Sequence, residues 1–222
     1  EVFLGRRGLA SAARPGQILI DHSTVGPELS RACYRAANDR GAHFLDAPIS
    51  GGPAGAAAGT LAIMAGGDES AFERSLPTLR ALGKTIVHMG GPGAGSVTKL
   101  VNQILVAVNT LASCEALLVG IRSGLDPEKL DRVLKGAWGA SRMLERNAPL
   151  IASRDFGPSA APIRHFVKDL GLALELSVQM GLSLRATKEA ALLNRAAADA
   201  GMASHDLVAI YQLLERGMGP QL

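Results

Sequence analysis

The residues best suited to chemistry lie on one predicted helix. Lys99, Asn102 and Gln103 stand at positions i, i+3 and i+4 of a long apolar segment, so a helix places their side chains on one face. A cation and two amides among Leu, Val, Ile and Ala are costly to bury unless a polar group meets them. The glycines at the helix start would let another molecule or a loop approach the backbone closely. The competing interpretation, equally open on this segment alone, is that Lys99 reaches solvent near the helix end while neighbouring loops satisfy the amides.

The loop Asp46–Gly55 follows a predicted strand and is rich in small polar groups. Ser50 offers a hydroxyl, while Gly51 and Gly52 can present bare backbone N–H groups to an anion such as a carboxylate. In open α/β sheets, ligands lie just beyond the carboxyl ends of the strands, which is where this loop stands. An ordinary Pro/Gly turn is the alternative.

A second polar loop, residues 21–24, has the sequence Asp-His-Ser-Thr and also follows a predicted strand. Because a predicted helix comes next, Ser23 or Thr24 could serve only as its N-cap. Lys168 and Asp169 are adjacent in a later predicted helix, and such pairs are usually solvated surface charges.

Several common site patterns are missing from the sequence. The glycine-rich segment 90–95 does not spell G-x-G-x-x-G, and no other segment supplies that dinucleotide fingerprint. The five histidines show no ligand spacing, and Cys33 and Cys114 match no metal or redox motif. No metal site is therefore predicted.

Composition narrows the class of protein. With 47% hydrophobic and 19% charged residues, the chain can bury a real core and is not disordered. Its net charge is only +3 and its basic residues are scattered, which argues against nucleic-acid binding. The apolar segment 100–119 contains Asn102, Gln103, Asn109 and Glu115, a poor composition for a membrane span. We expect a cytoplasmic protein that binds no membrane, and no signal peptide is visible.

The order of elements predicts two domains. Strands are expected at 17–21, 42–47, 60–65 and 85–89, with helices at 27–38 and 70–82 between them. This alternation indicates an α/β domain over residues 1–95 with a partly parallel sheet. From residue 96 the pattern is helical only, which predicts an all-α domain over residues 96–222 on a long central helix. Helices are expected at 96–123, 127–135, 141–152, 163–180, 184–200 and 205–216.

Taken together, these segments resemble the β-hydroxyacid dehydrogenase family, which includes 3-hydroxyisobutyrate dehydrogenases and tartronate semialdehyde reductases. Four family patterns occur in order, and the resemblance covers nearly the whole chain. Residues 21–24 are similar to D-x-S-T/S near the nicotinamide, and residues 46–52 match the substrate-binding D-A-P-x-S-G-G. Residues 93–103 resemble the catalytic G-x-G-x-x-x-K-x-x-N-N/Q, and residues 166–170 resemble the C-terminal K-D-L motif.

The resemblance implies an NAD(P)-dependent oxidoreductase that interconverts a small 3-hydroxy acid and its semialdehyde. It implies a proton-transfer role for Lys99 and homo-dimers or tetramers formed through the helical domain. Substrate binding would fall to Ser50, Gly51, Gly52, Asn102 and Gln103, and cofactor binding to Ser23, Thr24 and Lys168.

One departure from the family pattern is serious. The family begins with βα units that carry a G-x-G-x-x-G/A turn for NAD or NADP, and the sequence lacks this diphosphate-binding motif. We therefore expect a partial Rossmann-like sheet whose N-terminal βα units are missing. The alternative function is that of an inactive homologue that acts only as an oligomerisation or interaction module.

Overall fold

The structure is a computed structural model that describes residues 1–217. These residues form two compact units, Glu1–Val101 and the residues from Asn102 onward. The division falls inside one long helix, whereas the sequence predicts a boundary between residues 95 and 96. Because one helix belongs to both units, no turn or linker in the sequence marks the division.

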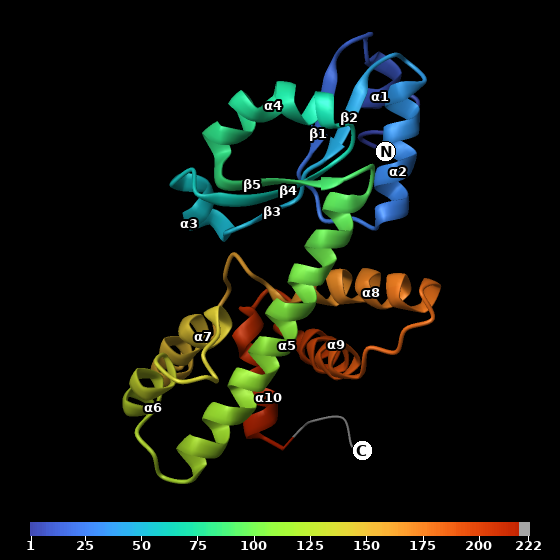
Figure 1. The fold of residues 1–222 in the computed structure, drawn as a ribbon. Coiled ribbons are helices and arrows are strands. Elements are labelled where there is room, and N and C mark those ends of the chain that lie inside the picture. The colour runs from blue at the N-terminus through green and yellow to red at the C-terminus, as the bar shows by residue number, and fades with distance from the viewer. Residues whose placement is uncertain (218–222) are drawn as a thin grey trace. The chain divides into compact units, whose positions relative to one another are not determined.

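The first unit is an α/β layer structure (Figure 1). Its strands are β1 (Ile18–Asp21), β2 (His43–Asp46), β3 (Ile49–Ser50), β4 (Leu61–Gly66) and β5 (Gly83–Gly90). Its helices are α1 (Leu9–Ala12), α2 (Pro27–Asn38), α3 (Gly52–Ala57) and α4 (Glu69–Leu82), and the start of α5 (Ala94–Arg122) completes the unit. All the predicted strands and helices of this unit are confirmed, while α1, β3 and α3 were not predicted.

The sheet is mixed rather than wholly parallel. β1 pairs with β2, and β4 with β5, in parallel, whereas β4 pairs antiparallel with both β2 and β3. β2 and β3 therefore run in the same direction on either side of β4, and the chain reverses direction through α3 before it enters β4. Successive residues of a strand face opposite sides, so Leu45 packs with residues of α4 and Phe44 with residues of α2.

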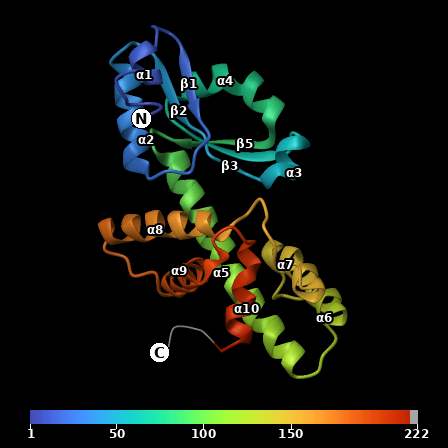
Figure 2. The same cartoon turned by 180° about the vertical axis from the view of Figure 1, so that it is seen from behind.

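As far as residue 217, the second unit contains helices and no strand, as predicted (Figure 2). It holds the rest of α5, then α6 (Pro127–Leu134), α7 (Arg142–Ser153), α8 (Ile163–Gln179), α9 (Arg185–Ala197) and α10 (Ile210–Glu215). A π-helical turn (Ala198–Met202) and a 3-10 turn (Leu207–Ala209) lie between the last two. At the start of α6 the Asp126 side chain accepts from the backbone N–H groups of Glu128 and Lys129, and Pro127 is the first residue of the helix.

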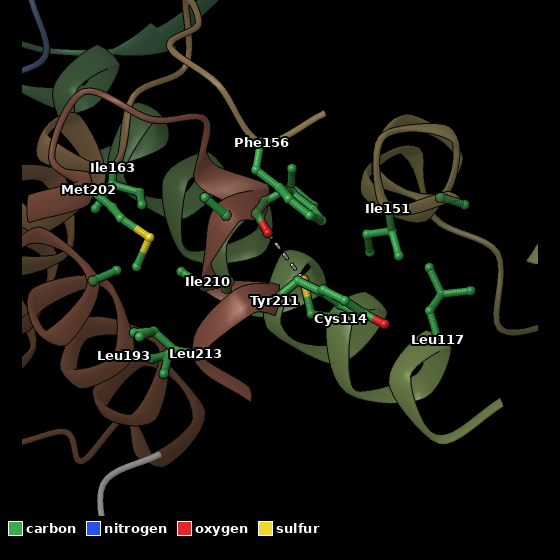
Figure 3. Close-up of a cluster of buried hydrophobic side chains, with 14 of the residues drawn as sticks. Cys114, Leu117, Ile151, Phe156, Ile163, Leu193, Met202, Ile210, Tyr211 and Leu213 are labelled. Carbon is green, nitrogen blue, oxygen red and sulfur yellow. Dashed lines mark hydrogen bonds between the residues drawn. The ribbon is translucent and has the colours of Figure 1, made fainter. Parts of the chain in front are cut away.

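The core of the helical unit surrounds the middle of α5 (Figure 3). Cys114 and Leu117 of α5 are buried against side chains of α7, α9 and α10, and Tyr211 stacks on Phe156. The Cys114 thiol points at the Val208 backbone oxygen, 4.0 Å away, and its burial raises the thiol pKa to about 12. This cysteine behaves as a small apolar residue, and its neighbours hold α5 at the centre of the unit.

Candidate active site

The side chain of Asp46 joins two of the motifs identified in the sequence. Asp46 ends β2 and is 2% exposed. Its Oδ1 accepts from the Gly93 backbone N–H at 2.9 Å, and its Oδ2 from the Ser96 N–H at 2.7 Å. Burial raises the pKa of this carboxyl, although these hydrogen bonds oppose the shift. The carboxylate therefore satisfies donors at the start of α5, which would otherwise lack intrahelical partners.

Glycines allow this close approach between α5 and the sheet. A Cβ on Gly95 would lie 2.2 Å from the backbone oxygen of Asp46 and 2.3 Å from that of Met64. The hydroxyls of Ser30 and Ser96, both buried, add a hydrogen bond of 2.8 Å between α2 and α5. The first turn of α5 is thus fixed from two sides.

The Ser50–Gly52 segment presents exposed backbone. Ser50 ends β3, and Gly51 and Gly52 have φ values of 135° and 62°, which favour glycine. Gly51 and Gly52 are both exposed, and a Cβ on Gly52 would meet no described atom within 4 Å. This open backbone suits an anionic group, which can approach its N–H donors closely.

The loop after β1 contacts the loop after β2. The His22 ring nitrogen Nδ1 lies 2.7 Å from the Ala47 backbone oxygen, and the Ser23 N–H donates to the Asp21 carboxylate. The Ser23 side chain is exposed at the carboxyl end of a parallel strand pair. Open α/β sheets bind nucleotides at that edge, so these residues fit one end of a dinucleotide. The turn that would bind the diphosphate is not part of this sequence.

Helix α5 carries the predicted polar face. Lys99 is 8% exposed and Gln103 is 6% exposed, while Asn102 is half-buried. The Asn102 amide donates to Gln103 Oε1 at 3.0 Å, and Gln103 Nε2 donates to Asp169 Oδ2 at 2.6 Å. Both polar ends of the Gln103 side chain are therefore engaged by protein groups, and the amide of Asn102 is held in one orientation.

Lys168 lies beside the same carboxylate. Its Nζ is 2.6 Å from Asp169 Oδ1; the side chain of Lys168 is 52% exposed, whereas that of Asp169 is 4% exposed. The pair is thus not the solvated surface pair that is usual for adjacent charges. Asp169 holds Gln103 with one oxygen and Lys168 with the other.

Sequence reasoning assigned no role to Asp46 or Asp169. A signal for Asp169 was present: Phe166, Asp169, Leu170 and Ala173 recur at helical spacing and form a buried face of α8. A carboxylate on an apolar face must have a partner. For Asp46 the partner lies about 50 residues later in the chain, and no local pattern marks such a contact.

Metal and membrane signals are weak in the described part of the chain. No group of three or more His, Cys, Asp or Glu side chains in residues 1–217 could hold a metal ion. Within the same residues, α5 is the one helix long and apolar enough to cross a membrane by length and composition. A third of its most apolar window (33%) is buried in the protein, and core helices of soluble proteins meet the same criteria.

Two family models match the chain, and together they cover most of it. Residues 1–91 match the NAD-binding domain of 6-phosphogluconate dehydrogenase. Residues 93–214 match the NAD-binding domain of NADP-dependent 3-hydroxyisobutyrate dehydrogenase. The boundary between the two matches falls at the glycine-rich turn before α5. The fold and the matched family models thus define the class of NAD(P)-dependent oxidoreductases that pair a Rossmann-like sheet with a helical domain.

Individual relatives agree with these models. The chain is 39% identical over 215 residues to 2-hydroxy-3-oxopropionate reductase of Escherichia coli, covering 97% of the chain and 73% of the relative. It is 36% identical to NAD-dependent L-serine dehydrogenase of Pseudomonas aeruginosa, covering 98% and 75%. The structure of Mycobacterium tuberculosis 3-hydroxyisobutyrate dehydrogenase with L-serine matches at a TM-score of 0.84 and 36% identity, covering 92% of the chain and 72% of that structure.

The chain belongs to the β-hydroxyacid dehydrogenase family, the family of 3-hydroxyisobutyrate dehydrogenase and tartronate semialdehyde reductase. These are soluble enzymes that use NAD or NADP. The NAD-binding domain is partially present in these residues, and the chain spans about three quarters of the length of the relatives compared above.

Proposed function

We propose that this protein interconverts a small 3-hydroxy acid and its semialdehyde with NAD or NADP, and that Lys99 transfers the proton. The observation that carries the proposal is the burial of Lys99, 8% exposed, on the helix face that it shares with Asn102. A buried lysine one helical turn before an amide on the same face suits a reacting oxygen that gains and loses a proton.

We assign the other roles on the basis of the resemblance, and the local geometry supports them. Ser50, Gly51 and Gly52 hold the substrate carboxylate through the hydroxyl and backbone N–H donors. Asn102 hydrogen-bonds a substrate hydroxyl, and Gln103 keeps that amide in orientation through its bond to Asp169. A carboxylate site paired with a hydroxyl site suits the serine and 2-hydroxy-3-oxopropionate named for the relatives.

On the cofactor side, Ser23, Thr24 and Lys168 would hold the nicotinamide nucleotide. When bound, that nucleotide supplies or accepts the hydride. The residues of this chain bind and orient the substrate and the nucleotide, and Lys99 moves the proton. We also propose a cytoplasmic location, because both cysteines of the described chain are free and buried.

The test is the Lys99→Ala variant of the full-length gene product, assayed with L-serine and with 2-hydroxy-3-oxopropionate. Proton transfer by a positioned side chain contributes roughly 10²–10⁴-fold, so kcat should fall by about that factor. The melting temperature should stay nearly unchanged, because alanine is a good helix former. Lys99→Arg should recover little, since a guanidinium group does not release its proton near neutral pH.

Lys188→Ala, which removes an exposed lysine of α9, is the matched control and should keep wild-type kcat. Wild-type kcat in Lys99→Ala would show that Lys99 is structural. Titration with NADH or NADPH separates this proposal from the alternative of a catalytically inactive assembly module. A change in nucleotide fluorescence on binding supports the enzyme. If no change occurs at millimolar nucleotide, the result supports the inactive assembly module.

A further inference from the structure

Asp46 lies where the substrate loop and the lysine helix begin. Its backbone ends β2 and continues through Ala47 and Pro48 into Ser50, while its side chain reaches the first turn of α5. We propose that Asp46 is a positioning residue that holds Lys99 in its reactive geometry. This inference rests on the proton-transfer role proposed for Lys99.

The two carboxylate oxygens act at different points of the helix start. Oδ1 accepts from Gly93, which precedes the helix, and Oδ2 accepts from Ser96 in its first turn. Two bonds to one rigid carboxylate fix both the position and the direction of that turn. Lys99 follows Ser96 by three residues, about one helical turn, so a rotation of the first turn moves the base of the lysine side chain.

The surroundings leave little room for the carboxylate to move. A Cβ on Gly66 would lie 2.6 Å from Asp46 Oδ1, and one on Gly95 would lie 2.2 Å from the Asp46 backbone oxygen. Strand backbone, carboxylate and helix start are thus in direct contact. A negative charge at a helix N-terminus is also favourable, because the helix dipole places partial positive charge there.

The same strand end also fixes the substrate loop. The Ala47 N–H donates to the Asp21 backbone oxygen, and the Met64 N–H donates to the Pro48 oxygen. The backbone on either side of these bonds carries Asp46 and Ser50. Asp46 therefore connects two parts of the proposed site. Its backbone leads into the loop proposed for the substrate carboxylate, and its side chain bonds the helix turn that precedes Lys99.

The experiment is a double-mutant cycle of Asp46→Asn with Lys99→Ala in the full-length gene product. An asparagine side chain keeps one acceptor oxygen but turns an N–H₂ group toward the second backbone N–H, so one bond is lost. Misplacement of a reacting group by about 1 Å can cost roughly 10²-fold, and we expect kcat of Asp46→Asn to fall by about that factor. Nucleotide affinity should be unchanged. In the Lys99→Ala background, Asp46→Asn should cause no further loss of kcat.

An equal loss of kcat in both backgrounds would overturn the inference, because the effect would then not pass through Lys99. Unchanged kcat in Asp46→Asn would overturn it as well. If Lys99→Ala alone keeps wild-type kcat, the proposed function itself fails. This outcome is distinguishable from a failure of the Asp46 inference, because it appears in the single Lys99 variant. Should Asp46→Asn not fold, Asp46→Glu carries the same cycle, because it keeps the charge but displaces both acceptors by one methylene.

Asp126→Asn is the matched control. Asp126 also accepts from two backbone N–H groups at a helix start, that of α6, and its loss should leave kcat unchanged. A readout without catalysis is amide hydrogen exchange in the 222-residue chain. Asp46→Asn should speed exchange in residues 93–99 and leave α8 unchanged; unchanged exchange in residues 93–99 would contradict the inference.

Discussion

Gln103 and Asp169 are 66 residues apart in the sequence, yet Gln103 Nε2 donates to Asp169 Oδ2 at 2.6 Å in the buried interior. The other oxygen of Asp169 lies 2.6 Å from Lys168 Nζ. A single carboxylate thus contacts the amide that orients Asn102 and the lysine proposed for the cofactor. In the proposed function, substrate binding and cofactor binding would therefore depend on the same buried charge.

Asp169→Asn should therefore affect both affinities. The substitution removes the charge and leaves one acceptor for two donors, and hydrogen bonds to a charged group contribute about 1.5–3 kcal/mol. We expect the KM for the hydroxy acid and for the nucleotide each to rise about tenfold, a change of roughly 1.4 kcal/mol, with a smaller change in kcat. Steady-state kinetics with each substrate varied in turn measures this. Lys168→Ala is the control and should change the nucleotide KM alone; unchanged KM values in Asp169→Asn would disprove the shared role.

Gly95→Ala should destabilise the first unit. The new Cβ would lie 2.2 Å and 2.3 Å from two backbone oxygens of the sheet, which cannot rotate away as a side chain could. Overpacking of this kind costs about 1–3 kcal/mol or more. Urea denaturation of the two variants measures the change in the free energy of unfolding. Gly91→Ala, four residues earlier in the chain, is the matched control, because a Cβ there meets no described atom within 4 Å. Equal stability of the two variants would contradict the close packing.

The sequence predicted the elements with strong local signals and missed those without them. Helix α2 begins at Pro27 and ends at Asn38 as predicted, because Pro at N1 and a regular buried stripe define it locally. Strand β3 was missed because two residues are too few for a pattern. Helix α3 was missed because Gly, Pro and Ala carry no apolar periodicity.

The residues of the candidate site also fall into those that local sequence predicts and those that it does not. Lys99, Asn102 and Gln103 could be placed on one face from helical spacing alone. Asp169 accepts a hydrogen bond from Gln103, and Asp46 accepts from the backbone at the start of α5. Both contacts join distant segments, which spacing does not reveal. The antiparallel pairs of β4 depend likewise on the direction that the chain takes after β3. Local periodicity thus predicts which side chains share a face but not which tertiary partners fix them.

The helical unit should lose stability in acid through Asp206. Burial alone would raise the pKa of this carboxyl, but hydrogen bonds from Arg146, Ser159 and the Val208 N–H outweigh it and hold the pKa below 3.8, its ordinary value. A carboxyl whose pKa is lower in the folded state stabilises the fold fully above its unfolded pKa. That contribution is lost as the pH falls below about 3.8 toward the folded pKa.

Asp206→Asn should therefore lower the free energy of unfolding at pH 7, on the order of 2 kcal/mol for lost hydrogen bonds to a charge. Below pH 4 the difference from wild type should shrink. Urea denaturation at a series of pH values gives both results. Asp39→Asn, at an exposed carboxylate after α2, is the control, and its free energy of unfolding should follow that of wild type at every pH. A stability difference in Asp206→Asn that does not depend on pH would contradict the linkage.

Helix α5 leaves large apolar side chains exposed, and we predict that a second copy of the chain covers them. Val101, Leu105 and Val119 are 52%, 57% and 68% exposed, and burying such a side chain fully contributes about 1.5–3 kcal/mol. Leu105→Glu should therefore shift the protein toward a smaller species in light scattering coupled to gel filtration. Leu29→Glu, on α2 at 47% exposure, is the control and should keep the wild-type mass. A wild-type protein that already runs as a monomer at micromolar concentration would refute assembly through α5.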